Sequence, residues 1–328
     1  MDRRREISLF AVSGALLALF ALLSLKCGIM DISWSEVGEI FTGAPGSRGE
    51  ILRELRLART LLAMLSGAAF AVSGVILQKV LHNDLASPDI LGISGGAGLA
   101  GITLLLIFPR WSGYLNAVAF AGAMSAALLI YLAAWKRRLS PVRLILAGVA
   151  FGALFSTAGS AVILANSDKL TGVMEFTIGG FSARNMADLR AAAPFFAASF
   201  LLAALLPRRL DMLSLGRDDA VALGLDVERN RLAALAVAAL AAATAVSVSG
   251  LLGFVGLMAP HLAARLLGSC RGAPLMTLSP LIGALLTLGG DLLGRTLFSP
   301  RELPAGLFLS AAGALFFLLL LLKKQEEP

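Results

Sequence analysis

The sequence predicts an all-α integral membrane protein, and three observations carry that prediction. Hydrophobic residues make up 58% of the chain and charged residues only 15%, whereas soluble domains carry roughly 25% charged residues. Apolar runs of about 20 residues, the length of a membrane-crossing helix, recur between polar or glycine- and proline-containing breaks. Lysine and arginine gather in alternate breaks, as they do in cytoplasmic loops of membrane proteins. We interpret residues 1–328 as a single transmembrane domain.

The apolar runs predict ten transmembrane helices. Their approximate limits are 7–27, 57–80, 88–108, 113–135, 142–165, 189–206, 230–250, 252–268, 274–297 and 304–322. A cleaved signal peptide is the alternative for the first run. No A-x-A-like cleavage site follows that run, and it is about long enough to cross a bilayer, so a retained first span is favoured.

An even number of spans places both ends of the chain on one side of the membrane. With the N-terminus in the cytoplasm, 17 of the 28 lysines and arginines fall on the cytoplasmic side, which favours both termini inside. The net charge of +7 therefore reports loop topology rather than nucleic-acid binding. The main exception is a basic cluster, Arg48, Arg53, Arg56 and Arg59, which this topology places outside.

Two of the apolar runs are interrupted by proline and glycine. The first is residues 82–101, with Pro88 and five glycines, and the second is residues 249–268, with Pro260 and several glycines. Irregular backbone cannot face lipid, so each segment is expected to pack inside protein or to line a cavity. Close packing of helices through small residues is a second reason for these glycines.

A faint internal repeat accompanies the two breaks. The stretch RLARTLLAMLSGAAFAVSG, from Arg56, is similar to RLAALAVAALAAATAVSVSG, from Arg231, and each leads into one broken segment. The order of spans runs the first stretch inward and the second outward. This pattern favours an inverted repeat, an architecture in which the transport pathway lies at the repeat interface.

The segment from Pro207 to Arg231 is dense in charge and lies between two long apolar runs. Gly216 and Gly224 interrupt it, which predicts one or two short helices of about two turns rather than another span. One interpretation is a solvated loop that repeats the cytoplasmic positive charge. The other is a surface that a cytoplasmic partner recognises.

The sequence contains no recognisable catalytic or metal-binding constellation. His82 and His261 are its two histidines, and no pair of Cys, His or carboxylate residues stands at ligand spacing. No lysine is followed by Ser or Thr, so there is no Walker A sequence, and an ATP-driven process would need an ATPase on another polypeptide. Asp291 and Glu175 are taken as the acidic residues nearest the predicted spans, and such sparse charge disfavours a proton-driven carrier.

Five stretches in a fixed order carry a family resemblance. They are RLARTLLAMLSGAAFAVSGVILQKVLHNDLASPDILGISGGAGLAG, RRLSPVRLILAGVAFGALFS, LSLGRDDAVALGLDVERNR, GLLGFVGLMAPHLAARL and DLLGRTLFSPRELPAGLFLSAAGALFFLLLL. Together they span the chain from about Arg53 to the C-terminus. In order and spacing they resemble the FecCD-type, or type II, permease subunits of ABC importers for iron-siderophores, haem and cobalamin.

The resemblance implies a fold and a set of partners. Members have ten spans and pair, as a homodimer or as two similar chains, around one translocation path. Two cytoplasmic ATPase subunits bind ATP and Mg, so this chain is expected to bind no cofactor and to be a transport subunit rather than an enzyme. A periplasmic or lipid-anchored binding protein delivers a metal chelate to the bacterial inner membrane.

The resemblance also assigns residues to two sites at the inner face. Asn83 and Leu85, and Ser140 and Pro141, match the family's two cytoplasmic gate loops. Pro141 departs from the small polar residue usual at its position and would stiffen that gate. The ATPase-coupling site lies within the charged loop at about 207–231, and its leucines are expected to dock in a cleft of the ATPase with the charges at the rim. Its residues are Leu215, Gly216, Arg217, Asp218, Asp219, Ala220, Leu223 and Gly224.

At the outer face, Arg56, Arg59 and Arg295 match arginines that receive glutamates of the binding protein in relatives. Arginine suits this role because its planar guanidinium can pair with a carboxylate through two hydrogen bonds. Interaction with lipid headgroups is the alternative for these side chains.

The sequence thus predicts the permease subunit of an ATP-driven importer that moves a metal chelate by alternating access. Iron-siderophore is the favoured cargo, followed by haem and cobalamin. A stand-alone secondary transporter or channel is the alternative function, and it would work without an ATPase.

Overall fold

The structure, a computed structural model, describes most of the chain. The described residues are 3–28, 32–42, 49–50, 52–136, 138–167, 172–182 and 184–324. Among them, seven helices are long and apolar enough to cross a membrane, and three further apolar helices are shorter. The ten predicted spans are therefore confirmed as helices in the predicted order.

The ten helices have the following bounds. They are α1 (Arg3–Lys26), α4 (Ala58–Leu81), α5 (Ile93–Ile107), α6 (Leu115–Ala134), α7 (Pro141–Ala165), α9 (Met186–Ala204), α12 (Val227–Ser249), α13 (Val255–Leu267), α14 (Gly272–Thr296) and α15 (Ala305–Lys324). The shorter apolar helices among them are α5, α13 and the part of α15 from Ala305 to Leu320.

Short elements join the long helices. They are α2 (Trp34–Thr42), the π-helical turn η1 (Leu52–Leu57), the 3₁₀ turn η2 (Pro109–Tyr114), the antiparallel pair β1 (Trp135–Lys136) and β2 (Arg138–Leu139), α8 (Val173–Ile178), α10 (Pro207–Ser214) and α11 (Arg217–Ala222). Helices α10 and α11 confirm that the charged segment forms two short helices rather than a span.

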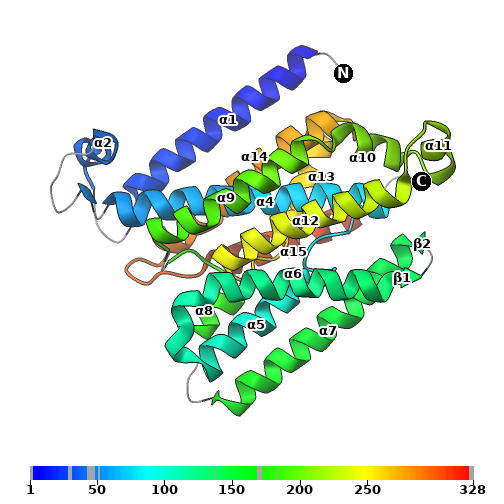
Figure 1. Cartoon of the computed structure of the whole chain (residues 1–328). Helices are drawn as coiled ribbons and strands as arrows, with labels where there is room; N and C mark the ends of the chain where they lie inside the picture. The colour runs from blue at the N-terminus through cyan, green and yellow to red at the C-terminus, as the bar shows by residue number, and fades with distance from the viewer. Residues whose placement is uncertain are drawn as a thin grey trace.

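The centre of the bundle is formed by α4, α12 and α14. Most residues of these three helices are buried within the chain, whereas α1 and α7 are largely exposed. Figure 1 shows α4 and α12 in the middle of the bundle, with α1 along one side and α7 along the opposite side. A helix that is apolar on every face and also buried belongs to the protein core, so α4, α12 and α14 form the frame on which the outer helices rest.

Helices α4 and α14 touch backbone to backbone through a pair of glycines. A Cβ atom on Gly67 would overlap the carbonyl of Gly283, and one on Gly283 would overlap the carbonyl of Gly67. The Thr287 hydroxyl adds a 2.7 Å hydrogen bond to the carbonyl of Ala63 across the same contact. Small residues permit such close approach of membrane helices, where packing and interhelical hydrogen bonds replace the hydrophobic effect.

The two broken segments are shorter as helices than their predicted spans. The span predicted to begin at residue 88 becomes helical only at Ile93, and the one predicted to begin at residue 252 becomes helical only at Val255. Left-handed backbone accounts for both late starts, because Gly92 has φ 73° and Phe254, a non-glycine residue, has φ 67° directly before α13. Both breaks pack inside protein, as predicted: Pro88 is buried, and Gly256 lies in contact with Pro88 and with the carbonyl of Phe70.

Helices α4 and α12 pack against each other and run in opposite directions (Figure 1). Each ends at a break, and each break leads into a short helix, α5 or α13. This is the arrangement that the predicted inverted repeat requires.

The elements outside the spans fall at two ends of the bundle. Helices α10 and α11 and the β1–β2 pair lie at one end, together with the start of α1 and the end of α15, while α2 and α8 lie at the other end (Figure 1). We call these the inner end and the outer end, following the predicted orientation.

The α4–α14 contact generates a stability prediction. Gly67→Ala should lower the free energy of unfolding by about 1–3 kcal/mol, because the added methyl group overpacks a backbone contact that cannot yield. Thermal unfolding of the purified protein in detergent measures the change. Gly14→Ala is the matched control, since nothing lies within 4 Å of its Cβ position in α1. Equal unfolding temperatures for the two variants would show that the contact is not tight.

Candidate functional site at the two ends of the bundle

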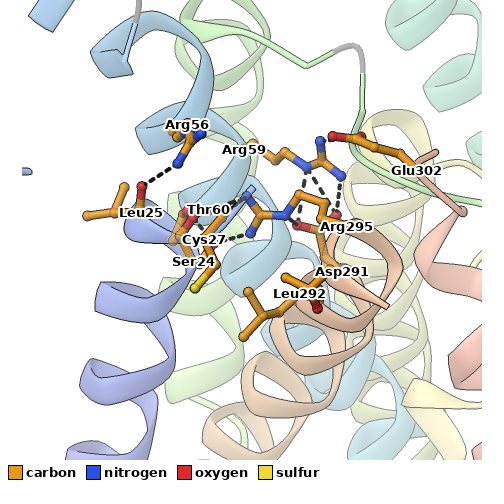
Figure 2. Close-up of polar contacts among 11 residues, drawn as sticks. Ser24, Leu25, Cys27, Arg56, Arg59, Thr60, Asp291, Leu292, Arg295 and Glu302 are labelled. Carbon is orange, nitrogen blue, oxygen red and sulfur yellow. Dashed lines mark hydrogen bonds and ion pairs between the residues drawn. The ribbon is translucent and has the colours of Figure 1, made fainter. Parts of the chain in front are cut away.

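At the outer end, Arg59 forms the centre of an ion network. Its Nε and Nη2 donate to Oδ1 of Asp291 at 3.1 and 2.8 Å, and its Nη1 donates to Oε2 of Glu302 at 2.8 Å. Figure 2 shows the Arg59 guanidinium, from α4, between the Asp291 carboxylate of α14 and Glu302. The network therefore joins the start of α4 to the end of α14 and to the segment that leads into α15.

Arg295 joins the same network one helical turn after Asp291. Its Nε lies 3.2 Å from Oδ2 of Asp291. Its Nη2 donates to the Ser24 hydroxyl at 2.6 Å and its Nη1 to the Ser24 carbonyl at 3.1 Å, and the Ser24 hydroxyl in turn lies 2.7 Å from that of Thr60. These bonds attach the C-terminal end of α1 to α14 and α4 (Figure 2).

Arg56 binds the carbonyls at the end of α1. Its Nη1 donates to the carbonyls of Leu25 and Lys26 at 2.9 and 2.8 Å. The last carbonyls of a helix have no partner within the helix and carry partial negative charge, so a cation placed there stabilises the helix end. Arg53 of the same basic cluster is exposed, and Arg48 lies outside the described residues.

The network places two of the three predicted docking arginines inside the protein. Arg59 is 8% exposed, Arg295 2% and Asp291 1%. Glu302 is the most accessible member, with 22% of its side chain exposed. In this conformation Glu302 already binds Nη1 of Arg59, and the docking role stays a prediction.

At the inner end, Asn83 and Leu85 lie in a tight turn after α4. The Asn83 side chain accepts a 2.9 Å hydrogen bond from the backbone N–H of Leu85, and the Asn83 carbonyl accepts one from Ala86 at 3.0 Å. Leu85 is 56% exposed. The turn thus fixes its own backbone and presents an apolar side chain at the surface.

The second predicted gate, Ser140 and Pro141, begins α7. Ser140 has extended backbone and its carbonyl accepts from Leu144 at 3.1 Å, while Pro141 occupies the first helical turn. Proline is favoured there because its fixed φ suits a helix start and its missing N–H would have no helical partner. Pro141 therefore defines where α7 begins.

The two predicted gates are linked through glycine contacts, not through their own side chains. A Cβ atom on Gly92 would lie 2.8 Å from the carbonyl of Gly148, and one on Gly148 would lie 2.9 Å from Cα of Leu91. The segment that carries Asn83 and Leu85 therefore ends against α7, two turns after Pro141. This backbone contact joins the two predicted gate segments.

Asp89 is a polar residue of this region that the sequence reasoning missed. Its carboxylate accepts a hydrogen bond from the Ser94 hydroxyl, in the first turn of α5. The Asp89 side chain therefore helps to fix the start of α5. A signal was present, because Asp89 follows Pro88 inside an apolar run.

The predicted coupling residues form an exposed surface on α11 and its flanking turns. Leu215 and Leu223 are 57% and 59% exposed, and Asp218 and Asp219 are exposed between them. Gly216 and Gly224 have φ values of 107° and 81°, which only glycine adopts easily, so they set the turns at both ends of α11.

Two predicted coupling residues have contacts inside this chain. Ala220 is fully buried, so it anchors α11 and does not belong to the exposed face. Arg217 pairs with Glu228 of α12 at 3.2 Å. Val221 is 54% exposed and also belongs to the exposed apolar face, although it was not predicted.

Both histidines contact neighbouring residues of the chain. His82 bonds through Nε2 to the carbonyl of Leu213, and the His261 ring meets that of Phe316 edge to face. Within the part of the chain that the structure describes, no three His, Cys, Asp or Glu residues group as metal ligands do.

Comparison with known proteins gives a consistent result over nearly the whole chain. The model of the FecCD transport family matches residues 16–323. The Fe(3+)-citrate import system permease protein YfmE of Bacillus subtilis is 36% identical, over 96% of this chain and 95% of its own length. The ferric enterobactin transport system permease protein FepG of Escherichia coli is 33% identical, over 96% of each chain.

A solved structure agrees with the sequence relatives. It is an inward-facing conformation of a transporter assigned to the metal-chelate type of ABC transporters, and it matches with a TM-score of 0.83 and 27% identity. The match covers 97% of this chain and 99% of the other. The arrangement of the ten helices is therefore shared along the entire chain.

The outer network generates a prediction about buried charge. Asp291→Asn should lower the free energy of unfolding by about 3–5 kcal/mol, because it leaves the buried Arg59 and Arg295 guanidiniums without their shared counter-charge. Chemical or thermal unfolding in detergent measures the loss.

Glu54→Gln is the control for that variant. Glu54 pairs with Arg190 at 3.7 Å with both side chains well exposed, so its loss should change stability by less than about 1 kcal/mol. Similar losses in the two variants would contradict a special role for the buried network.

Proposed function

The chain belongs to the FecCD transport family and is the membrane permease subunit of an ATP-binding-cassette importer, and we propose that its cargo is an iron-siderophore chelate. The supporting observation is that relatives similar over nearly their full length are named as permeases for Fe(3+)-citrate and ferric enterobactin. Haem and cobalamin follow as alternative cargoes. As a permease subunit the chain is not an enzyme.

We propose that ATP hydrolysis takes place on two partner subunits that dock at the inner end. ATP and Mg bind to those subunits, since this sequence has no Walker A motif. The surface for docking is formed by Leu215, Val221 and Leu223, with Asp218 and Asp219 at its rim. An apolar helix face of this kind suits a groove in a partner.

We propose that two copies of the permease pair around one translocation path and that the chelate crosses between them. The Asn83–Leu85 turn and the Ser140–Pro141 helix start act as inner gates. Their contact through Gly92 and Gly148 supports opening and closing as a unit. The chain spans the bacterial inner membrane with both termini in the cytoplasm, which places the gates beside the ATPase subunits.

We propose that a binding protein delivers the chelate at the outer end, where Arg56, Arg59 and Arg295 gather. The burial of Arg59 and Arg295 gives this docking a specific form. A carboxylate of the binding protein replaces Glu302 on Nη1 of Arg59, while Asp291 keeps the other side of the guanidinium. The exchange trades one arginine–carboxylate bond for another.

The exchange predicts the effect of removing Glu302. Glu302→Gln should bind the loaded binding protein at least about threefold more tightly, because the competing carboxylate is gone while Asp291 still orients Arg59. Surface plasmon resonance on the permease in nanodiscs measures the affinity. Weaker binding by Glu302→Gln would show that Glu302 positions the site and does not compete for it, and Glu54→Gln controls for loss of charge at the same end.

The coupling surface predicts loss of the ATPase partner. Reversing Asp218 and Asp219 to Lys, or replacing Gly216 by Val, should weaken capture of the ATPase subunit at least about tenfold, equivalent to roughly 1.4 kcal/mol. The first change inverts the rim charge, and the second strains a backbone with φ 107°. Pull-down from purified components measures capture, with Glu54→Lys at the outer end as the control. Unchanged ATP-dependent uptake in both variants would refute the coupling assignment.

Cargo and function are tested together by ATP hydrolysis. The permease, purified with its ATPase in nanodiscs, should hydrolyse ATP faster when the binding protein loaded with a ferric siderophore is added. Stimulation by the haem- or cobalamin-loaded protein alone would reassign the cargo. Transport by the chain alone, down an ion gradient and without an ATPase, would replace the importer by a secondary transporter.

A further inference from the structure

The inner end of α4 is tied to α10 by contacts that the proposed function does not use. Nζ of Lys79, in the last turn of α4, lies 3.3 Å from Oδ1 of Asp211 in α10 and also donates to the carbonyl of Cys270, just before α14. The Lys79 side chain is only 12% exposed. One ammonium group therefore holds together α4, α10 and the turn that precedes α14.

Asp211 makes a second bond that fixes α10 to α14. Its Oδ1 accepts from the backbone N–H of Gly272, the first residue of α14, at 2.7 Å. A Cβ atom on Gly272 would lie 2.6 Å from the carbonyl of Pro207, so α10 rests directly on the start of α14. A carboxylate at a helix N-terminus is favoured because the first N–H groups have no partner within the helix.

A third contact holds the other end of α10. His82 ends α4 in a left-handed conformation, φ 51°, and its Nε2 lies 3.0 Å from the carbonyl of Leu213. Leu213 stands two residues before Leu215, where the exposed coupling surface begins. Together, Lys79, Asp211 and His82 clamp α10 onto α4 and α14.

Open space separates this clamp from α13. A cavity of about 670 Å³ is lined by Lys79, His82 and Ser214 on one side and by His261 and Arg265 of α13 on the other. Helix α10 packs on α4, α14 and α12, and α13 packs on α4 and α14. A displacement of α10 therefore passes directly to α4, α14 and α12, and it reaches α13 through α4 and α14.

Helices α4 and α14 reach from this clamp to the outer network as one unit. They are joined at the inner end by Lys79 through Asp211 and Gly272, in the middle by the Gly67–Gly283 contact, and at the outer end by Arg59 and Asp291. Twenty residues of helix separate Arg59 from Lys79, which is about 30 Å at 1.5 Å per residue. Helices α4 and α14 therefore connect the end of the bundle proposed to face the ATPase with the end proposed to face the binding protein.

We infer that Lys79 and Asp211 are positioning residues that make α10 and the α4–α14 pair move as one body. Displacement of the coupling surface by the ATPase then reaches the outer arginine network, and docking at the outer end reaches the ATPase by the same route. This inference rests on the proposed function, because it assumes that an ATPase docks beside α10. Such coupling needs a contiguous element that both sites bias.

The test removes the ion pair and keeps the shapes. Lys79→Met retains the length of the side chain, and Asp211→Asn retains an acceptor for the Gly272 N–H. Each variant, and the double variant, should reduce stimulation of ATP hydrolysis by the loaded binding protein at least about threefold. Capture of the ATPase subunit and hydrolysis without the binding protein should remain at wild-type values, since the exposed coupling surface is intact.

Three further results complete the test. Lys79→Arg should restore most of the stimulation because it keeps the charge. Arg271→Met, which removes an exposed basic residue beside the clamp, should behave as wild type. The double variant should lose no more than Lys79→Met alone, because Asp211→Asn removes only the ion pair that Lys79→Met also removes.

Four outcomes separate the inference from its premise. Wild-type stimulation in Lys79→Met would overturn the clamp, and so would losses that add in the double variant. A loss of stimulation that only parallels a fall in unfolding temperature would show that the ion pair serves stability alone. This outcome would also overturn the inference. A wild-type permease that captures no ATPase would instead refute the proposed function.

Discussion

The structure depends on one buried carboxylate, that of Asp291. Asp291 is 1% exposed and pairs with the guanidiniums of Arg59 and Arg295. Arg59 also pairs with Glu302, and Arg295 also donates to Ser24 near the end of α1. The carboxylate without the arginines, or the arginines without the carboxylate, would be unfavourable at this site, because an unpaired ion in a low-dielectric interior costs several kcal/mol. The group therefore fixes the relative positions of α1, α4 and α14 at the outer end.

That constraint divides the chain into a buried, closely packed part and a more exposed part. Helices α4, α12 and α14 are buried, and α4 and α14 are joined by a backbone contact that admits no extra methyl group. Helix α7 is mostly exposed and meets the first gate segment through Gly148 and Gly152. A permease that alternates between two conformations needs such a division, since tightly packed cores shift between discrete arrangements and do not deform continuously.

The sequence predicted the fold almost completely, because hydropathy and breaks determine where membrane helices begin and end. It misplaced the starts of α5 and α13, where residues 88–92 and 252–254 are mostly apolar but not helical. The positions of single side chains could not be predicted from the sequence. The arginine motif gave no sign that Arg59 points inward, since its partner Asp291 is 232 residues away in the chain. Ala220 and Leu215 share one apolar pattern, and only packing against α10 and α12 buries the first and exposes the second.

The inward orientation of Arg59 has a consequence for delivery. A permease must hold its binding protein long enough to receive the chelate and then release it. A free, exposed arginine would gain a full charged hydrogen bond on docking, whereas Arg59 already has Glu302 at 2.8 Å. In the proposed exchange the number of bonds on Arg59 is unchanged, so the contribution of Arg59 to the docking energy is the difference between two similar arginine–carboxylate pairs. The proposed exchange leaves the bond between Arg59 and Asp291 in place, so it acts on a guanidinium that Asp291 already orients and that α4 connects to the inner end.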